Sequence, residues 1–222
     1  QKVSIENIIR GIIIHSGNDA CIAIAETLSG TENEFAVEMN AMARDLGLTN
    51  SSFTNSTGWP HKDHYMSSVD LVKIATLIRD QFPKYYAYFS EKSFTWNDIT
   101  QKNRNPMLDK GLGADGLKTG HTQEAGYGLV GSAKRGNRRV TFVISGMNSK
   151  KERMREAEKI VTWAYRDFTA KKIVEKDQII GKIPVWLGEK SEVELISKED
   201  IFILTSPSKN TEIKSFIKFS QP

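Results

Sequence analysis

The first apolar positions of the chain recur at the three- and four-residue spacing of a helix. Isoleucines at positions 5, 8, 9 and 12 share one face of residues 4–14, which predicts an amphipathic helix there. The polar stretch 16–19 interrupts this pattern. The small, apolar run 20–28 then predicts a second, buried helix that Gly30 would end. The chain is therefore expected to open with two helices joined by a short polar turn.

Two further helices are predicted after this pair, with a polar segment between them. Thr31 and Glu34 have the spacing of a capping box, which predicts the start of the third helix. Residues 49–64 are rich in Asn, Ser, Thr and Gly and indicate a long loop. A helical pattern resumes over 68–82, where Pro83 is expected to stop the helix.

The middle of the chain has patterns that are typical of strands. Residues 85–96 are aromatic and favour β-structure, whereas 101–105 are polar and indicate a loop. Two apolar segments, 127–133 and 138–145, are joined by the turn-forming residues 134–137. This arrangement predicts a β-hairpin.

One more long helix is predicted after the hairpin. Asn148 or Ser149 would cap it, and it would reach Phe168. Its apolar face would be formed by Ile160, Trp163 and Ala164. The order of helices, then strands, then a helix predicts an α+β fold rather than repeated βαβ units.

The pattern changes again from about Lys172. Short alternating stretches separated by turn residues follow, at 183–187, 193–196, 201–204 and 213–219. Alternation of this kind predicts a small all-β piece. We therefore expect two domains, 1–171 and 172–222.

Composition indicates an ordinary globular protein. Hydrophobic residues make up 39% and charged residues 26%, and the net charge is only +4. No block of Lys and Arg with interleaved aromatic residues is present, so nucleic acid is not an expected partner. The single cysteine, Cys21, excludes an internal disulfide and lies in an apolar run typical of a buried thiol.

Two short motifs carry the candidate chemistry. Ser16-Gly17-Asn18 lies between the first two predicted helices. Residues 118–122, Lys-Thr-Gly-His-Thr, precede the predicted hairpin. Each motif alone occurs by chance in many proteins, but S-x-N followed by K-T-G is the pairing found in β-lactamases and penicillin-binding proteins.

With these motifs, segments 8–26, 50–65 and 115–122 resemble the low-molecular-mass penicillin-binding proteins that are D-alanyl-D-alanine carboxypeptidases. The resemblance implies a penicillin-binding-protein-like domain, an antiparallel sheet with helices, followed by a small all-β domain. It implies a serine-type peptidase without a cofactor or metal, acting on peptidoglycan stem peptides that end in D-Ala-D-Ala and inhibited by β-lactams. Export to the periplasm or the outer face of the cytoplasmic membrane is implied too, with membrane association through segments outside this sequence.

The resemblance also implies roles for individual residues. The catalytic residues would be Ser16 as a proton relay, Asn18 as an orienting amide and Lys118 as a source of positive charge. The residues that bind the substrate would be Arg104, Thr119, Gly120, His121 and Arg153. Among these, Thr119 and the arginines would receive the terminal carboxylate, and the His121 backbone N–H would donate to the oxyanion.

The family also has an S-x-x-K motif that supplies the attacking serine, and none lies before Ser16. The strings Ser206 to Lys209 and Ser215 to Lys218 fit the spacing but follow K-T-G in the β-rich tail, so we interpret them as chance matches. We therefore expect a chain without the N-terminal portion that holds the nucleophile. Restoring that portion would separate an active carboxypeptidase from a silent peptidoglycan-binding homologue.

Other enzyme classes have weaker support. A β-lactamase is disfavoured, because Gly17 replaces the Asp of S-D-N and no Glu is followed four positions later by Asn. His61 and His64 have no further metal-ligating cluster beside them and are interpreted as surface or structural histidines. A Ser-His-Asp site lacks the G-x-S-x-G signature.

Overall fold

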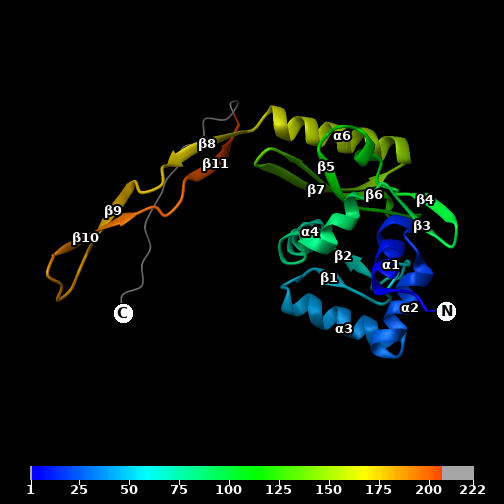
Figure 1. Cartoon of the computed structure of the whole chain (residues 1–222). Coiled ribbons are helices and arrows are strands. Elements are labelled where there is room, and N and C mark those ends of the chain that lie inside the picture. The colour runs from blue at the N-terminus through cyan, green and yellow to red at the C-terminus, as the bar shows by residue number, and fades with distance from the viewer. Residues whose placement is uncertain (1, 207–222) are drawn as a thin grey trace. The chain divides into compact units, whose positions relative to one another are not determined.

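The computed structural model describes residues 2–206 of the chain. It divides the chain into two compact units, Gln1–Val161 and Thr162–Pro222. The first unit combines helices with antiparallel strands, and the described part of the second contains strands after the end of the last helix (Figure 1). The predicted α+β class is therefore confirmed. The boundary expected at 171/172 stays a prediction.

The helices begin and end close to where local sequence signals place them. They are α1 (Ile5–Arg10), the π-helical turn η1 (Gly11–His15), α2 (Asn18–Ser29), α3 (Glu32–Asp45), α4 (Ser68–Gln81), α5 (Pro83–Tyr86), the 3₁₀ turns η2 (Ala87–Ser90) and η3 (Pro106–Asp109), and α6 (Lys150–Arg166). The Thr31 hydroxyl accepts the Glu34 N–H at 3.1 Å and thereby caps α3. Gly30 ends α2 with a φ of 83°, a left-handed conformation that glycine adopts without strain.

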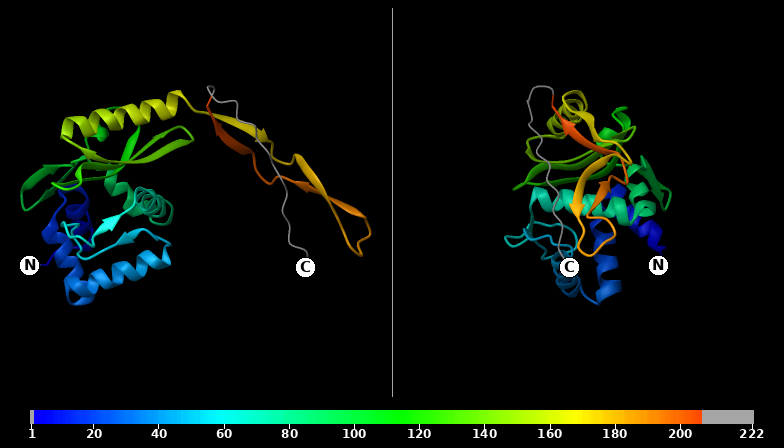
Figure 2. Two further views of the ribbon diagram at one scale, coloured as in Figure 1. Left: turned by 180° about the vertical axis from the view of Figure 1, so that it is seen from behind. Right: turned by 90° about the vertical axis from the view of Figure 1, so that its left-hand side faces the viewer.

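The main sheet of the first unit has three antiparallel strands in the order β5-β6-β7. They are β5 (Ala114–Thr122), β6 (Gly126–Arg135) and β7 (Arg138–Met147). The predicted hairpin is confirmed as β6 and β7. In Figures 1 and 2, α4 lies below this sheet and residues 150–161 of α6 lie along its other face. The sheet is thus a middle layer between helices.

Two predicted loops contain short strands. Within the segment 49–64, β1 (Ser51–Ser52) forms a two-residue ladder with β2 (Tyr65–Met66), beside α3 in Figure 2. Residues 101 and 102 belong to β4 (Ile99–Lys102), which pairs with β3 (Ser93–Trp96). Polar side chains are compatible with β4 because all four of its residues are exposed.

The β-structure predicted over 85–96 is wrong for the first part of this segment. Residues 83–90 are helical instead, as α5 followed by η2. The helical backbone places Tyr86 against Ala75 and Leu117, whereas Tyr88 joins a separate cluster with Ile13 and Ile14. Burial of these aromatic rings in two core clusters therefore overrides their strand propensity.

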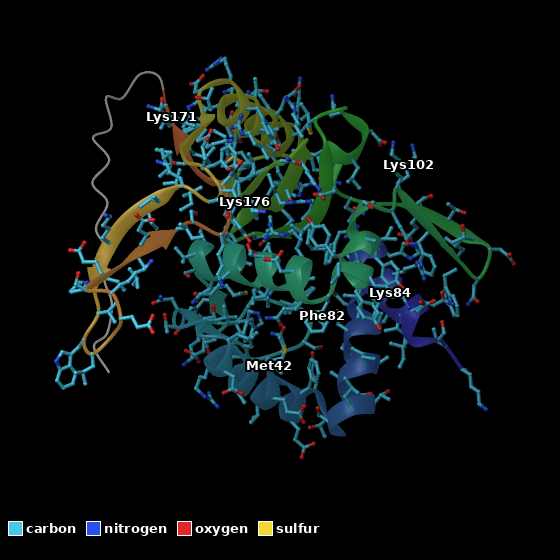
Figure 3. All side chains as sticks on the ribbon, turned by 60° about the vertical axis from the view of Figure 1, so that its left-hand side comes forward. Met42, Phe82, Lys84, Lys102, Lys171 and Lys176 are labelled. Atoms are coloured by element: carbon cyan, nitrogen blue, oxygen red, sulfur yellow. The ribbon has the colours of Figure 1, made fainter. Side chains whose placement is uncertain are left out.

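The apolar face predicted for the last helix is also partly wrong. Ala157, Val161 and Ala164 are its buried hydrophobic residues, while Trp163 is 49% exposed. The Trp163 ring makes an edge contact with Phe168, at a centroid distance of 4.9 Å. Large apolar side chains are exposed on other helices too, and Figure 3 marks Met42 on α3 and Phe82 after α4.

The described part of the second unit contains two antiparallel ladders. β8 (Thr169–Val174) pairs with β11 (Ile201–Thr205), and β9 (Ile179–Pro184) pairs with β10 (Glu192–Ile196). The β-structure expected for this part of the chain is confirmed for these strands. The stretch 213–219 lies outside the described residues.

Candidate active site

Ser16 occupies a sharp turn between two helices. The π-helical turn η1 ends at His15, and Ser16 follows with φ 58° and ψ 46°, in the left-handed region. Gly17 is then the N-cap of α2, whose first residue is Asn18. The His15 ring hydrogen bonds to the Phe94 carbonyl at 2.9 Å and so ties this turn to β3. The sequence did not predict the π-helical turn or this contact.

The structure joins the two motifs directly. Lys118 on β5 donates from Nζ to the Ser16 Oγ at 2.7 Å, across 102 positions of sequence. The same Nζ donates to the carbonyl of Thr119 at 3.1 Å. The Lys118 ammonium is therefore held by two oxygen acceptors at the end of η1.

The surroundings of Lys118 make it an unusually acidic lysine. Burial, followed by the positive charge of Arg104, lowers its pKa from 10.5 to about 8; Cys21 acts in the opposite sense, and Arg153 adds a smaller lowering. Burial in turn raises the pKa of the Cys21 thiol. A lysine of this kind can exchange a proton near neutral pH far more readily than an ordinary one.

Arg153 is placed beside the K-T-G strand. It is buried, with an exposed fraction of 5%, and Nη1 makes long hydrogen bonds to the Gly120 carbonyl at 3.4 Å and the Gly128 carbonyl at 3.3 Å. Burial lowers the pKa of its guanidinium. Its Nε has no hydrogen-bond partner among residues 2–206. A buried cation with a free donor is suited to binding an anion.

The other predicted site residues are in or near β5. Thr119, Gly120 and His121 follow Lys118 along the strand, and the His121 ring stacks on Tyr127 of β6 at 3.9 Å. Arg104 is exposed between β4 and η3, close enough to act on the charge of Lys118. Asn18 is exposed at the start of α2. The roles predicted for these residues stay predictions.

A group of polar residues at the start of β5 was not predicted. Asp115 forms an ion pair with Arg139 of β7 at 2.7 Å and accepts a hydrogen bond from the Tyr86 hydroxyl at 3.1 Å. Asp115 opens the segment 115–122 that carries the resemblance, but no motif marks Tyr86 or Arg139. The three positions, 86, 115 and 139, become neighbours only when α5 packs beside the sheet.

His61 and His64, which were considered as metal ligands, accept hydrogen bonds from backbone N–H groups of the loop that contains them. His64 Nδ1 accepts the Thr54 N–H at 3.1 Å, and His61 Nδ1 accepts the Asp63 N–H at 3.2 Å. Within residues 2–206 we find no group of three or more His, Cys, Asp or Glu side chains that could hold a metal ion.

The same residues, 2–206, include no helix that is both long and apolar enough to cross a membrane.

Comparison with known proteins gives matches over both units. The family described as D-alanyl-D-alanine carboxypeptidase matches residues 1–150, and the C-terminal domain of penicillin-binding protein 5 matches 168–222. The D-alanyl-D-alanine carboxypeptidase DacD of Escherichia coli (strain K12) is 37% identical over 215 residues. That alignment covers 96% of this chain and 55% of the relative, so the chain spans about half of that protein's length.

Solved structures give the same picture. Penicillin-binding protein 5 from Haemophilus influenzae superposes with a TM-score of 0.84 at 38% identity, covering 95% of this chain and 62% of that one. Penicillin-binding protein D2 from Listeria monocytogenes, in its ampicillin-bound form, superposes with a TM-score of 0.68 at 27% identity. This second match covers 73% of this chain and 68% of that one.

Proposed function

Because the chain belongs to the D-alanyl-D-alanine carboxypeptidase family, we propose that it forms one wall of a serine-type site that releases terminal D-alanine from peptidoglycan stem peptides. The resemblance inferred from the motifs is thereby confirmed at the level of the family. The observation that carries the proposal for this chain is the 2.7 Å hydrogen bond between Lys118 Nζ and Ser16 Oγ, which unites the two motifs in one place.

In the proposed reaction, Ser16 and Lys118 move the proton that the leaving group needs. The attacking serine belongs to an S-x-x-K motif, which we place outside residues 1–222. When this serine adds to the peptide carbonyl, its hydroxyl proton passes to the lysine of the S-x-x-K motif; when the C–N bond then breaks, the departing D-alanine nitrogen must gain a proton. Ser16 Oγ can relay that proton, and the neighbouring Lys118 ammonium polarises the hydroxyl. A pKa of about 8 lets Lys118 change protonation state near the working pH.

The terminal carboxylate of the substrate would bind beside Thr119. Arg153 supports this placement because its buried guanidinium already contacts the Gly120 carbonyl and keeps Nε without a partner among the described residues. Arg104 would add positive charge from the exposed side. A carboxylate paired with a buried arginine gains charge-assisted hydrogen bonds that a peptide with an amidated C-terminus lacks.

The substrate backbone would lie along β5 as an added strand. Within residues 2–206, β5 pairs in a sheet with β6 alone, so its other edge has no strand partner and could take an extended peptide along the K-T-G segment. Gly120 fits this arrangement, because a Cβ added there would meet no atom within 4 Å. The missing side chain leaves space for a peptide to approach. The neighbouring His121 N–H is our candidate oxyanion donor.

β-Lactams would acylate the same attacking serine. The support is the likeness to penicillin-binding protein D2, whose structure is of the ampicillin-bound form.

Since peptidoglycan lies outside the cytoplasmic membrane, the proposal also requires export of the complete protein. In the proposed reaction, neither the attack by the serine nor the protonation of the leaving D-alanine needs a metal or a cofactor.

The test is release of D-alanine by the complete gene product from a pentapeptide that ends in D-Ala-D-Ala. A matched peptide ending in D-Ala-L-Ala is the control, and we expect release only from the first. A complete protein that binds the peptide but releases nothing would instead be a silent homologue. Intact mass after incubation with a penicillin tests the location of the nucleophile. An adduct on residues 1–222 alone would refute our placement of the attacking serine.

The two S-x-x-K strings of the tail are covered by the same mass measurement. Ser206 is the last described residue, after β11, and Lys209 and the string from Ser215 to Lys218 lie outside the described residues. A penicillin adduct mapped to Ser206 or Ser215 would make one of them the nucleophile. We expect both peptides to stay unmodified.

A further inference from the structure

The backbone of β5 has an irregularity just before the K-T-G motif. In the ladder with β6, Ala114 pairs with Ala133 and Gly116 pairs with Ser132, so Asp115 has no paired residue. Such a bulge inserts one residue and redirects the strand that follows. Because Asp115 is the extra residue of the bulge, its side chain can contact elements other than β6.

Asp115 ties β5 to two other elements. Its two carboxylate oxygens accept from the two terminal nitrogens of Arg139 on β7, each at 2.7 Å. The Tyr86 hydroxyl of α5 donates to Asp115 at 3.1 Å. Arg139 also donates to the Tyr86 oxygen at 3.2 Å and to the Ser132 hydroxyl of β6. We call Tyr86, Asp115 and Arg139 the β5 clamp.

The clamp continues into tight packing around the next two residues. A Cβ added to Gly116 would lie 3.3 Å from the Tyr86 hydroxyl, so this part of the strand lies directly against the ring. Leu117 is 4% exposed and packs in one core cluster with Tyr86. All three residues before Lys118 are therefore fixed by Tyr86, through a hydrogen bond, a close backbone contact and a buried side chain.

We propose that Tyr86, Asp115 and Arg139 are positioning residues that hold β5 so that the Lys118 ammonium meets the Ser16 hydroxyl. The inference rests on the proposed function, in which these two groups carry the proton. The clamp touches neither the substrate nor the reacting atoms. It sets the register and direction of the strand from which Lys118 extends.

The influence of the clamp on Lys118 is geometric rather than electrostatic. Asp115 and Arg139 together carry no net charge, and the titratable neighbours that act on the pKa of Lys118 are Arg104, Cys21 and Arg153. Loss of the whole pair would therefore change the burial of Lys118 and its contact with Ser16, with little change in the surrounding charge. Asp115→Asn and Arg139→Gln alter the local charge in opposite senses, so a shift of the Lys118 pKa in the same direction for both variants reports the change in geometry. A partly exposed ion pair is also weak support for stability by itself, which leaves positioning as its main effect.

The experiment compares Asp115→Asn and Arg139→Gln with the wild-type complete gene product. The pKa of Lys118, followed by NMR titration of its side chain, should rise from about 8 toward 10.5 because a displaced lysine is better hydrated. For D-alanine release, kcat should fall by about 10- to 100-fold with little change in KM, since misplacement by about 1 Å costs up to about 100-fold. Arg139→Lys, which keeps the charge, should recover part of kcat.

Asp70→Asn is the matched control. Asp70 is a buried carboxylate of α4 that accepts from the Asn50 N–H and the Ser51 hydroxyl, both at 2.8 Å. This variant should lower the melting temperature while leaving the pKa of Lys118 and kcat unchanged. If either clamp variant fails to fold, Tyr86→Phe takes its place, because it removes one hydroxyl and keeps the ring. It should shift the Lys118 pKa and kcat in the same direction by a smaller amount.

The proposal is overturned if the folded clamp variants lose melting temperature as Asp70→Asn does but keep the pKa of Lys118 and kcat at wild-type values. The NMR measurement needs no turnover, which separates the two ideas. A wild-type protein without D-alanine release, whose clamp variants still raise the pKa of Lys118, would refute the proposed function and leave the positioning role intact.

Discussion

Replacing Lys118 by methionine should make the first unit more stable near neutral pH. Burial and two arginines lower the pKa of this lysine from 10.5 to about 8, so the folded protein holds the proton less tightly than the unfolded chain does. Protonation of Lys118 therefore opposes folding. Lowering a pKa by one unit corresponds to about 1.4 kcal/mol, so keeping Lys118 protonated in the folded state costs about 3 kcal/mol of stability.

The cost depends on pH in a defined direction. Below about pH 8 both states carry the proton and the cost is complete. Between about pH 8 and 10.5 only the unfolded chain keeps the proton, so the stability of the wild type rises with pH through that window. Lys118→Met has no such group. Its advantage near pH 7 should be about 1–2 kcal/mol after the loss of the hydrogen bonds to Ser16 and Thr119, each worth about 1 kcal/mol.

Urea unfolding followed by far-ultraviolet circular dichroism measures this advantage, because α1 to α5 all belong to the first unit. The difference between Lys118→Met and wild type should shrink as the pH rises through the window and then reverse. The matched control is Lys102→Met on the exposed strand β4 (Figure 3), which should leave the pH profile of stability unchanged. The reasoning would be refuted by a Lys118→Met variant that is less stable than wild type near pH 7. It would also be refuted if the difference in unfolding free energy between variant and wild type were the same at all pH values.

Three serine and glycine substitutions test the site and the packing of the sheet. Ser16→Ala should lower kcat for D-alanine release by about 100-fold or more while costing only about 1 kcal/mol of stability through the lost hydrogen bond to Lys118, and normal turnover would remove Ser16 from the proton pathway. Gly120→Ala should leave stability unchanged, since the added methyl meets no atom within 4 Å, but raise KM for the peptide; a wild-type KM would contradict the added-strand geometry. Gly131→Ala should destabilise by about 1–3 kcal/mol, because its Cβ would lie 2.3 Å from the Phe142 ring. A melting temperature equal to wild type would show that this ring moves aside freely.

Features whose signals lie within a few residues of one another were predictable from the sequence. The cap of α3 depends on Thr31 and Glu34, and the end of α2 depends on Gly30 alone. The β6–β7 hairpin follows from two apolar runs and the short turn between them. In each case the physical cause is local, so one stretch of sequence contains all of it.

Features decided by tertiary packing were not predictable in the same way. The aromatic residues Tyr86 and Tyr88 favour strands by propensity, yet both are helical because their rings fill two separate core clusters. Helical spacing assigned Trp163 and Ala164 to one buried face; Ala164 is buried, but Trp163 is 49% exposed, and Val161 is buried although it was not predicted. The period of the helix was right, and the direction of its buried side was set by the sheet.

The site shows the same division. The motifs identified Ser16 and Lys118 as candidates, and the structure then placed them 2.7 Å apart. The low pKa of Lys118 depends first on its burial and then on Arg104 and Arg153, which come from separate segments of the chain. The bond from Asp115 to Arg139 joins two strands across a third and has no sequence signature. Motifs therefore predicted the reacting groups but not the residues that we propose to position them.

The open side of β5 also affects how copies of the protein meet one another. An edge strand can pair with any extended chain, including the same edge of a second molecule, and lysines in such strands discourage this. Two β5 edges brought together would force two Lys118 ammonium groups into proximity, each already beside positive arginines. The charge that we assign to the reaction would thus also oppose self-association. Lys118→Met should gain stability and at the same time lose part of its resistance to aggregation.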